Sequence, residues 1–384
     1  MAENTTETIP NDARPAGQPI RIDYVPRSGL LRLSIVNFLL GIVTLSVYRF
    51  WAKTNVRRHI WSCVHINGEP LEYTGRGMEL FKGALIVFAI FGLPFIIAIS
   101  AINLVYGPQH PAIFGMQMLI FLTIGVLWGA AVYRARRYQL TRTLWRGIRG
   151  TLAGSSMTYS LMYFGAILAR GMTLGWSTPV MNFNLQQQMI GDMRFGSMPF
   201  KFKGRAGPLY PTYALCWFLT LAVLVAMLAG AGLAIYAIFG DTLSQIFKSA
   251  GENNSPPDQS AMAALLVAPI LLAYFLAFAF YPVIWSFYTA RELRIFADYT
   301  TADRAQFRFD ATAWSVIKLA VGNFLLWIFT LGIARPFIQQ RLVRFLCDRI
   351  RIEGTIDIDG IEQPTDPLGT TGEGLADALD VGGF

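Results

Sequence analysis

Charged residues are scarce in this sequence. Only 15% of its 384 residues are Asp, Glu, Lys or Arg, whereas 54% are hydrophobic. Cysteine and histidine are rarer still, with three of each, and neither occurs at the spacing of a metal site or a disulfide framework. This composition argues against an ordinary soluble domain and predicts a chain whose natural solvent is the lipid bilayer.

Catalytic motifs are missing as well. The sequence contains no nucleophile elbow, phosphate-binding loop or complete dinucleotide-binding glycine motif, so we expect no enzyme activity, no cofactor and no metal. The long apolar runs contain no carboxylate, which removes the side chains that usually couple transport to protons or ions. The N-terminus lacks the apolar core of a signal peptide, and no cleaved leader is expected.

Paired apolar runs dominate two regions of the chain. A helix that crosses the bilayer core needs about 20 apolar residues, and residues 83–133 and 213–288 each hold two such runs, broken near Pro108 and near Pro256. Each region is predicted to form a transmembrane helical hairpin. Basic residues are concentrated away from the two breaks, so the positive-inside rule places the breaks outside and both termini in the cytoplasm.

Three related units lie around these hairpins, at residues 19–82, 134–212 and 289–360. The pattern Asn-Phe-Leu-Leu-x-Ile-x-Thr-Leu begins at Asn37 and recurs 286 positions later at Asn323. A weaker middle copy aligns its own Thr-Leu-Gly with these two. Each unit is predicted to contain an apolar segment, a Thr-Leu-Gly/Ser break, a polar or basic helix and a small β-hairpin.

The predicted hairpins turn at Asn67-Gly68 and at Gly196-Ser197, and in the third unit residues 350–353 and 356–359 flank Gly354. Residues 1–18 and the acidic segment 361–384 are predicted to be disordered.

The apolar segment of each unit is too short for an ordinary span and has basic residues on both sides. Copies one and three hold about 16 apolar residues, below the usual spanning length. We predict that these segments enter the membrane and return, or lie along its surface. Ordinary spanning helices, seven in all, are the alternative.

Residues 37–61 resemble the YjgN-like family of bacterial inner-membrane proteins. The matching features are Asn-Phe-Leu-Leu, Thr-Leu-Ser-Val-Tyr-Arg-Phe-Trp-Ala-Lys and the pair Arg57-Arg58. Ser46 stands where the family usually has glycine, and the resemblance extends over roughly residues 21–360. The resemblance implies a location in the bacterial inner membrane but no activity, because the function of the family is unknown.

The predicted fold class is an all-α polytopic membrane protein. It combines transmembrane helical hairpins with re-entrant or interfacial helices in an internal repeat, and carries small cytosolic β-hairpins.

Polar side chains recur at membrane depth within the repeated units. They either cap the following helix and tie neighbouring helices together, or converge on a polar site whose helix N-termini favour an anion. The residues are Asn37, Thr44, Thr173, Thr330 and Asn323.

Basic residues beside the apolar segments have two interpretations. They act only as topology determinants, or they contact anionic lipid headgroups. The candidate lipid contacts are Arg49, Lys53, Arg57, Arg58, Arg134, Arg136, Arg137, Arg335 and Arg344. Nucleic-acid binding is not expected, because these residues adjoin membrane segments.

Two functions follow from these interpretations. One is a transporter or channel for a small anionic or amphipathic solute. The alternative is a non-transporting membrane-organising protein that binds anionic lipid or a protein partner through its basic cytoplasmic face. The sequence does not fix the oligomeric state.

Overall fold

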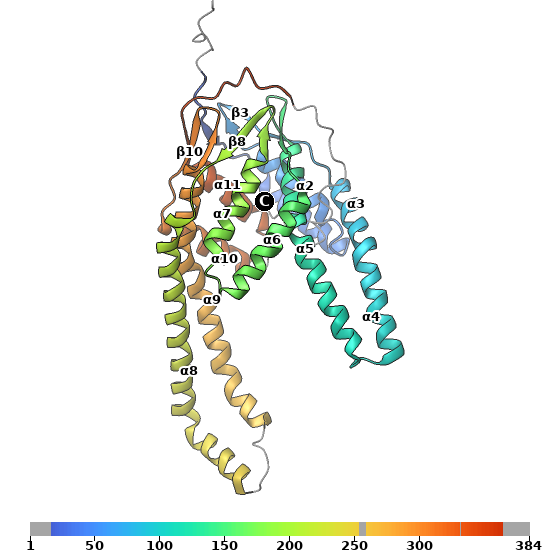
Figure 1. Cartoon of the computed structure of the whole chain (residues 1–384), viewed down its shortest axis with the longest axis vertical. Coiled ribbons are helices and arrows are strands. Elements are labelled where there is room, and N and C mark those ends of the chain that lie inside the picture. Colours follow the sequence, from blue (N-terminus) through green and yellow to red (C-terminus); the bar gives the residue numbers. More distant parts are fainter. Residues whose placement is uncertain (1–16, 253–258, 331, 364–384) are drawn as a thin grey trace, which may run out of the picture. The chain divides into compact units, whose positions relative to one another are not determined.

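The computed structural model of the chain describes residues 17–252, 259–330 and 332–363 (Figure 1). Its contacts divide the chain into two compact units. The first contains Met1–Arg205, Phe296–Asp310 and Leu325–Phe384, and the second contains Ala206–Ile295 and Ala311–Phe324. The strands described below all belong to the first unit.

An antiparallel sheet of eight strands, in the order β11-β10-β9-β8-β7-β6-β5-β4, dominates the first unit. Its strands are β4 (Glu72–Tyr73), β5 (Thr143–Trp145), β6 (Ile148–Leu152), β7 (Met193–Phe195), β8 (Met198–Phe202), β9 (Thr300–Ala302), β10 (Ala305–Phe309) and β11 (Ile350–Glu353). A smaller sheet contains β1 (Ile22–Tyr24), β2 (Val64–Ile66) and β3 (Glu69–Pro70).

The prediction of an all-α protein with small separate hairpins is therefore wrong in this respect. An isolated hairpin is marginally stable and leaves its edges unpaired. Here the edges of successive hairpins pair with one another, so that segments far apart in the chain form one continuous sheet.

Two of the predicted turns are present, and one predicted pairing is wrong. The chain turns between β2 and β3 at Asn67-Gly68 and between β7 and β8 at Gly196-Ser197. In the third unit, β11 pairs with β10 rather than with residues 356–359, and Ile356 instead forms a bridge with Gln18. The hairpins β5–β6 and β9–β10 were not predicted.

One apolar core is shared by strands from both sheets. Its buried residues are Trp145, Ala302, Ala305, Ile356 and Ile358, and side chains of β2, β7, β8, β10 and β11 pack against them. The segment after β11 continues across this region, where the Ser197 amide donates to the Glu362 carbonyl at 3.0 Å. The first residues of the predicted acidic tail therefore contact the β7–β8 turn, while residues 364–384 and 1–16 lie outside the described residues.

Helices connect the strands. In and around the first unit they are α1 (Leu30–Val43), α2 (Arg49–Trp61), α3 (Gly77–Val87), the π-helical η1 (Phe88–Gly92), α4 (Leu93–Tyr106), α5 (Pro111–Thr141), α6 (Ser156–Met172), α7 (Thr178–Gly191), α10 (Ala313–Phe329), which extends into both units, and α11 (Arg335–Cys347). The short η2 (Gly207–Leu209), α8 (Tyr210–Glu252) and most of α9 (Gln259–Asp298) belong to the second unit.

Long apolar helices confirm the membrane class. Among the described residues, three segments are long and apolar enough to cross a bilayer, namely Gly77–Tyr106, Pro111–Thr141 and Gly207–Ile238. They coincide with three of the predicted spans. The fourth predicted span falls within α9, a helix of 40 residues whose side chains are in part outside the described set.

Each helical segment leaves and re-enters the sheets at neighbouring strands. Paired strands flank α1–α2 (β1 with β2), α3–α5 (β4 with β5), α6–α7 (β6 with β7), α8–α9 (β8 with β9) and α10–α11 (β10 with β11). Paired strands lie only about 5 Å apart. The strand before each helical segment and the strand after it are therefore neighbours in a sheet.

Candidate functional site

The repeated threonines lie where the first helix of each short segment ends. In all three breaks the hydroxyl donates to the carbonyl four residues earlier and accepts from the amide four residues later. For Thr44 these distances are 2.6 Å to the Leu40 carbonyl and 3.0 Å to the Tyr48 amide. Thr173 and Thr330 make the same bonds. These hydrogen bonds join the two helices of each segment, as a local cap would.

The backbone of each break has a left-handed residue two positions after the threonine. Ser46 has φ 69°, Gly175 φ 89° and Gly332 φ 86°. The amide of each donates to the carbonyl five residues earlier, at 2.7 Å, 2.7 Å and 3.2 Å respectively. This geometry ends a helix and favours glycine, which explains the Thr-Leu-Gly/Ser pattern.

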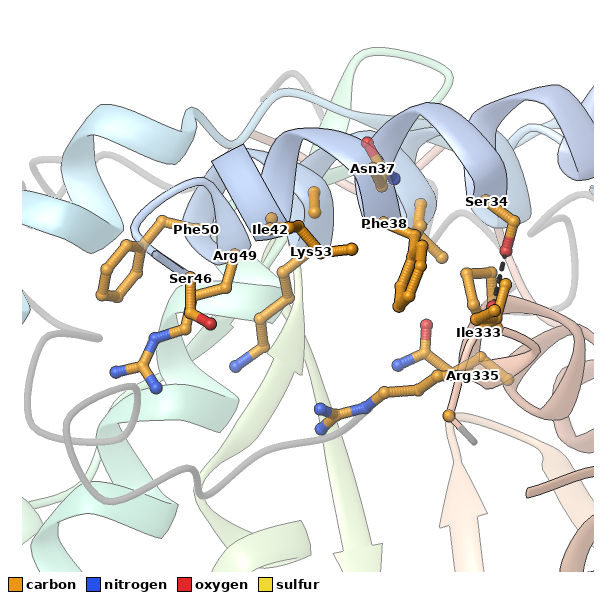
Figure 2. A pocket seen from close by; sticks show the side chains of 16 residues that line it. Ser34, Asn37, Phe38, Ile42, Ser46, Arg49, Phe50, Lys53, Ile333 and Arg335 are labelled. Carbon is orange, nitrogen blue, oxygen red and sulfur yellow. Dashed lines mark hydrogen bonds between the residues drawn. The ribbon is translucent and has the colours of Figure 1, made fainter. Parts of the chain in front are cut away.

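A cavity of about 340 Å³ lies within the first unit, between α1, α2 and the start of α11 (Figure 2). The Ser34 hydroxyl donates to the Ile333 carbonyl at 3.0 Å and so ties α1 to the break that precedes α11. Apolar side chains form much of the wall, namely Phe38, Ile42, Phe50, Ile333 and Pro336.

Three basic residues line this cavity, and none of its described lining residues is an Asp or a Glu. Arg49 and Lys53 lie one turn apart on α2, and Arg335 begins α11. Figure 2 shows the three side chains extending to the same side of α1. The Arg49 guanidinium also lies 5.0 Å from the centroid of the Phe50 ring. The cavity therefore combines concentrated positive charge with apolar walls.

Asn37 lines the same cavity and is only 9% exposed. Neither its Nδ2 nor its Oδ1 has a hydrogen-bond partner among the described residues. A buried polar group without a partner costs about 1–3 kcal/mol. Asn323, the matching residue of the third copy, belongs to the second unit.

Three other predicted lipid contacts make hydrogen bonds within the protein. Arg57 is buried and donates to the Tyr73 hydroxyl at 3.3 Å, and Arg58 donates to the Gly75 carbonyl at 3.2 Å. Arg137 donates to the Leu152 carbonyl at 2.9 Å. Their charges are used to satisfy internal acceptors.

The remaining predicted contacts lie elsewhere. Arg134 is exposed and lies 3.4 Å from the Ser156 hydroxyl. Arg344 is exposed and forms an ion pair with Asp348 at 3.6 Å. Arg136 lines a different cavity. The candidate lipid contacts thus divide into cavity, structural and surface residues.

Gln339 lines the cavity and was missed from the sequence. It lies 286 positions after Lys53, the same separation that relates Arg49 to Arg335 and Ser46 to Gly332. Several residues that line the cavity are therefore separated by the offset that relates the first and third predicted units. That offset was the signal by which Gln339 could have been found.

Comparison with known proteins agrees with the resemblance seen in the sequence. The family described as bacterial protein of unknown function (DUF898) matches residues 26–378. The inner membrane protein YjgN of Salmonella typhimurium is 24% identical over 370 residues, which cover 87% of this chain and 88% of that protein. YjgN of Escherichia coli O157:H7 is 29% identical over 117 residues, or 30% of this chain and 27% of that protein.

No solved structure matches the chain. The names of these relatives and the apolar helices support a location in the inner membrane. With a match that covers most of its length, the chain belongs to the DUF898 family of bacterial proteins of unknown function.

Proposed function

We propose that this inner-membrane protein binds the headgroup of an anionic phospholipid in the cavity lined by Arg49, Lys53 and Arg335. The observation that carries the proposal is the grouping of three basic side chains in one partly apolar cavity, with no Asp or Glu among its described lining residues. Such a cavity suits a ligand with a negative, hydrogen-bonding head and an apolar body. The proposed role is binding rather than catalysis.

The strand pairing supports a membrane position for this cavity. A helical segment whose two ends lie on paired strands crosses the membrane an even number of times. The α1 helix has 14 residues and α2 has 13, and at 1.5 Å per residue each is about 20 Å long, whereas the bilayer core is about 30 Å thick. Two such helices do not cross twice, so the segment enters the membrane and returns.

Exposed apolar side chains at the breaks support the same arrangement. Leu45 is 89% exposed in the first break, and Leu174 is 79% exposed in the second. Large apolar side chains at the tip of a short helical hairpin suit contact with lipid tails. In this arrangement the strands face the cytoplasm, where the positive-inside rule places the basic helices and both termini.

An internal threefold repeat forms part of the proposal. It is supported by the identical hydrogen bonds of Thr44, Thr173 and Thr330, and by the matched positions that line the cavity. The same bonds weaken the transporter hypothesis, because hydroxyls that cap their own helices are not available to line a polar path.

The proposal is tested with dihexanoyl phosphatidylglycerol and the zwitterionic dihexanoyl phosphatidylcholine, both soluble in water. Binding to the purified full chain in a neutral detergent is measured by microscale thermophoresis. We expect phosphatidylglycerol to bind at least tenfold more tightly than phosphatidylcholine. The double variant Arg49→Gln/Arg335→Gln should lose at least tenfold in affinity, or about 1.4 kcal/mol.

Arg344→Gln is the matched control, because Arg344 lies on α11 with Arg335 but does not line the cavity. It removes one positive charge from the same helix. An equal loss of affinity in the control, or equal binding of the two lipids by the wild type, would show that the attraction is a general surface effect and would refute the proposal.

A further inference from the structure

A second cavity, of about 540 Å³, lies within the first unit among other elements. Its wall is formed by residues of the helices α5, α6 and α7 and of the strands β7, β8, β9, β10 and β11. From α5 it receives residues 132, 135, 136 and 139, a spacing that marks a single helix face. Its volume is in the range of cavities that hold small organic molecules, and none of its lining residues lines the first cavity.

Among the described residues that line this cavity, Arg136 is the basic one, and none is an Asp or a Glu. Its side chain is exposed. The neighbouring arginines of α5 are engaged, Arg134 with Ser156 and Arg137 with the Leu152 carbonyl. Arg136 has no hydrogen bond or ion pair with any residue that the structure describes. An uncompensated guanidinium therefore faces the cavity.

The rest of the wall is largely apolar. Met189 and Ile190 come from α7, and the rings of Phe200 and Phe307 lie with their centroids 6.0 Å apart. Gln139 and Gln186 add amide groups that can donate or accept. An exposed guanidinium at the wall of an apolar cavity can form a charge-assisted hydrogen bond with an anionic ligand. A carboxylate fits the two-pronged donor geometry of arginine.

We propose that this cavity is a binding site for a small organic monocarboxylate with an apolar body. The carboxylate pairs with Arg136, and the body packs against Met189, Phe200 and Phe307. This site is separate from the proposed lipid site and does not depend on it, because the two cavities are lined by different elements of the fold.

The probe for this site is 4-fluorobenzoate, an aromatic monocarboxylate that can be followed by fluorine NMR. The purified full chain in a neutral detergent should bind it saturably. Arg136→Gln should weaken binding at least tenfold, and Arg136→Lys, which keeps the charge without the planar fork, should weaken it less. Arg134→Gln is the matched control on the same helix, and its affinity should equal that of the wild type.

Gln186→Trp tests the cavity without touching the charge, since a larger side chain at this half-buried position fills the space and should abolish binding. Circular dichroism during heating verifies that each variant is folded. Failure of the wild type to bind saturably overturns the proposal. The proposal is also overturned if Arg136→Gln binds 4-fluorobenzoate with wild-type affinity, or if Arg134→Gln and Arg136→Gln lose the same amount of affinity. The Arg49→Gln/Arg335→Gln variant should retain its affinity for 4-fluorobenzoate, which separates the two sites experimentally.

Discussion

The two short helical hairpins α1–α2 and α6–α7 share one backbone design and differ in their second helix. Both start and end on paired strands, and both turn at a threonine that caps the second helix. However, α2 contains Arg49, Lys53 and the pair Arg57-Arg58, whereas α7 contains no charged residue.

This difference changes the chemistry of the neighbouring cavity. The α1–α2 hairpin surrounds a cavity with a basic wall, whereas α7 contributes glutamine and apolar side chains to a cavity whose charge comes from α5. We therefore infer that the turn positions the second helix, whereas the charge of each cavity depends on which helix supplies its basic residues. Changes to the turn should alter stability, and changes to the helix faces should alter binding.

The largest effect should be seen in membrane topology, the feature the two hairpins are proposed to share. Single cysteines at positions 45, 109 and 174 are tested in intact cells with a membrane-impermeant thiol reagent, in a background without native cysteines. Position 109, in the turn between α4 and α5, should be labelled because the long hairpin crosses the membrane. Positions 45 and 174 should not be labelled, because short hairpins turn back within it.

A cysteine at position 150 in β6 serves as the control, since it should be labelled only after the cells are permeabilised. Labelling at 45 or 174 in intact cells would mean that a short segment crosses the membrane. The native cysteines are replaced so that any labelling comes from the introduced cysteine. Of these native thiols, Cys347 should react slowly at neutral pH in any case, because burial raises its pKa to about 11 and keeps it protonated.

A smaller effect is expected when the caps are removed. Thr44→Val and Thr173→Val keep the shape of the side chain but lose both hydrogen bonds of the hydroxyl. Each should lower the free energy of unfolding by about 1–2 kcal/mol, measured by thermal denaturation in detergent. Thr44→Ser, which keeps the hydroxyl, is the control.

Lipid affinity should be unchanged in Thr44→Val, because its hydroxyl is engaged within the break. A loss of affinity without a loss of stability would instead place Thr44 in the binding site, and would restore the hypothesis of a polar site built from the repeated threonines.

Local patterns made part of this fold predictable. The apolar runs indicated the long hairpins, and Asn67-Gly68 indicated a β-turn because both residues tolerate positive φ, as the values of 50° and 84° show. The joining of hairpins into one sheet was not predictable from such patterns. Tyr73 pairs with Thr143 across the whole α3–α5 hairpin, and no local signal specifies that partner.

Strands and cavity residues within the arginine-rich segments were difficult to predict from the sequence. The β5–β6 hairpin turns at Arg146-Gly147, where Arg146 has φ 52°, an uncommon conformation for arginine. The arginine-rich sequence of this segment therefore did not indicate a hairpin. Arg134 and Arg136 are two residues apart and so lie on nearly opposite faces of α5. Helical spacing could have separated the surface residue from the cavity residue before the structure was known.

The smallest expected effect concerns the second of the two left-handed residues in each of the first two breaks. Ser46 has φ 69° in the first hairpin, and Gly175 has φ 89° in the second. A non-glycine residue in this conformation costs about 1–2 kcal/mol, and the greater freedom of glycine in the unfolded chain offsets about 0.5–1 kcal/mol of this. Ser46→Gly should therefore raise the free energy of unfolding by about 0.5–1 kcal/mol, and Gly175→Ser should lower it by a similar amount.

Thermal denaturation of the two variants measures the expected rise in the free energy of unfolding for Ser46→Gly and the expected fall for Gly175→Ser. Gly41→Ala, at an open position within α1, is the control for a glycine change outside a break, and should be stabilising because alanine favours a helix. If Ser46→Gly were destabilising, the serine side chain would be making a contact that outweighs its strained backbone. Ser46 lines the basic cavity. In that case the first hairpin would have a polar side chain at the proposed lipid site in place of the glycine that its turn prefers.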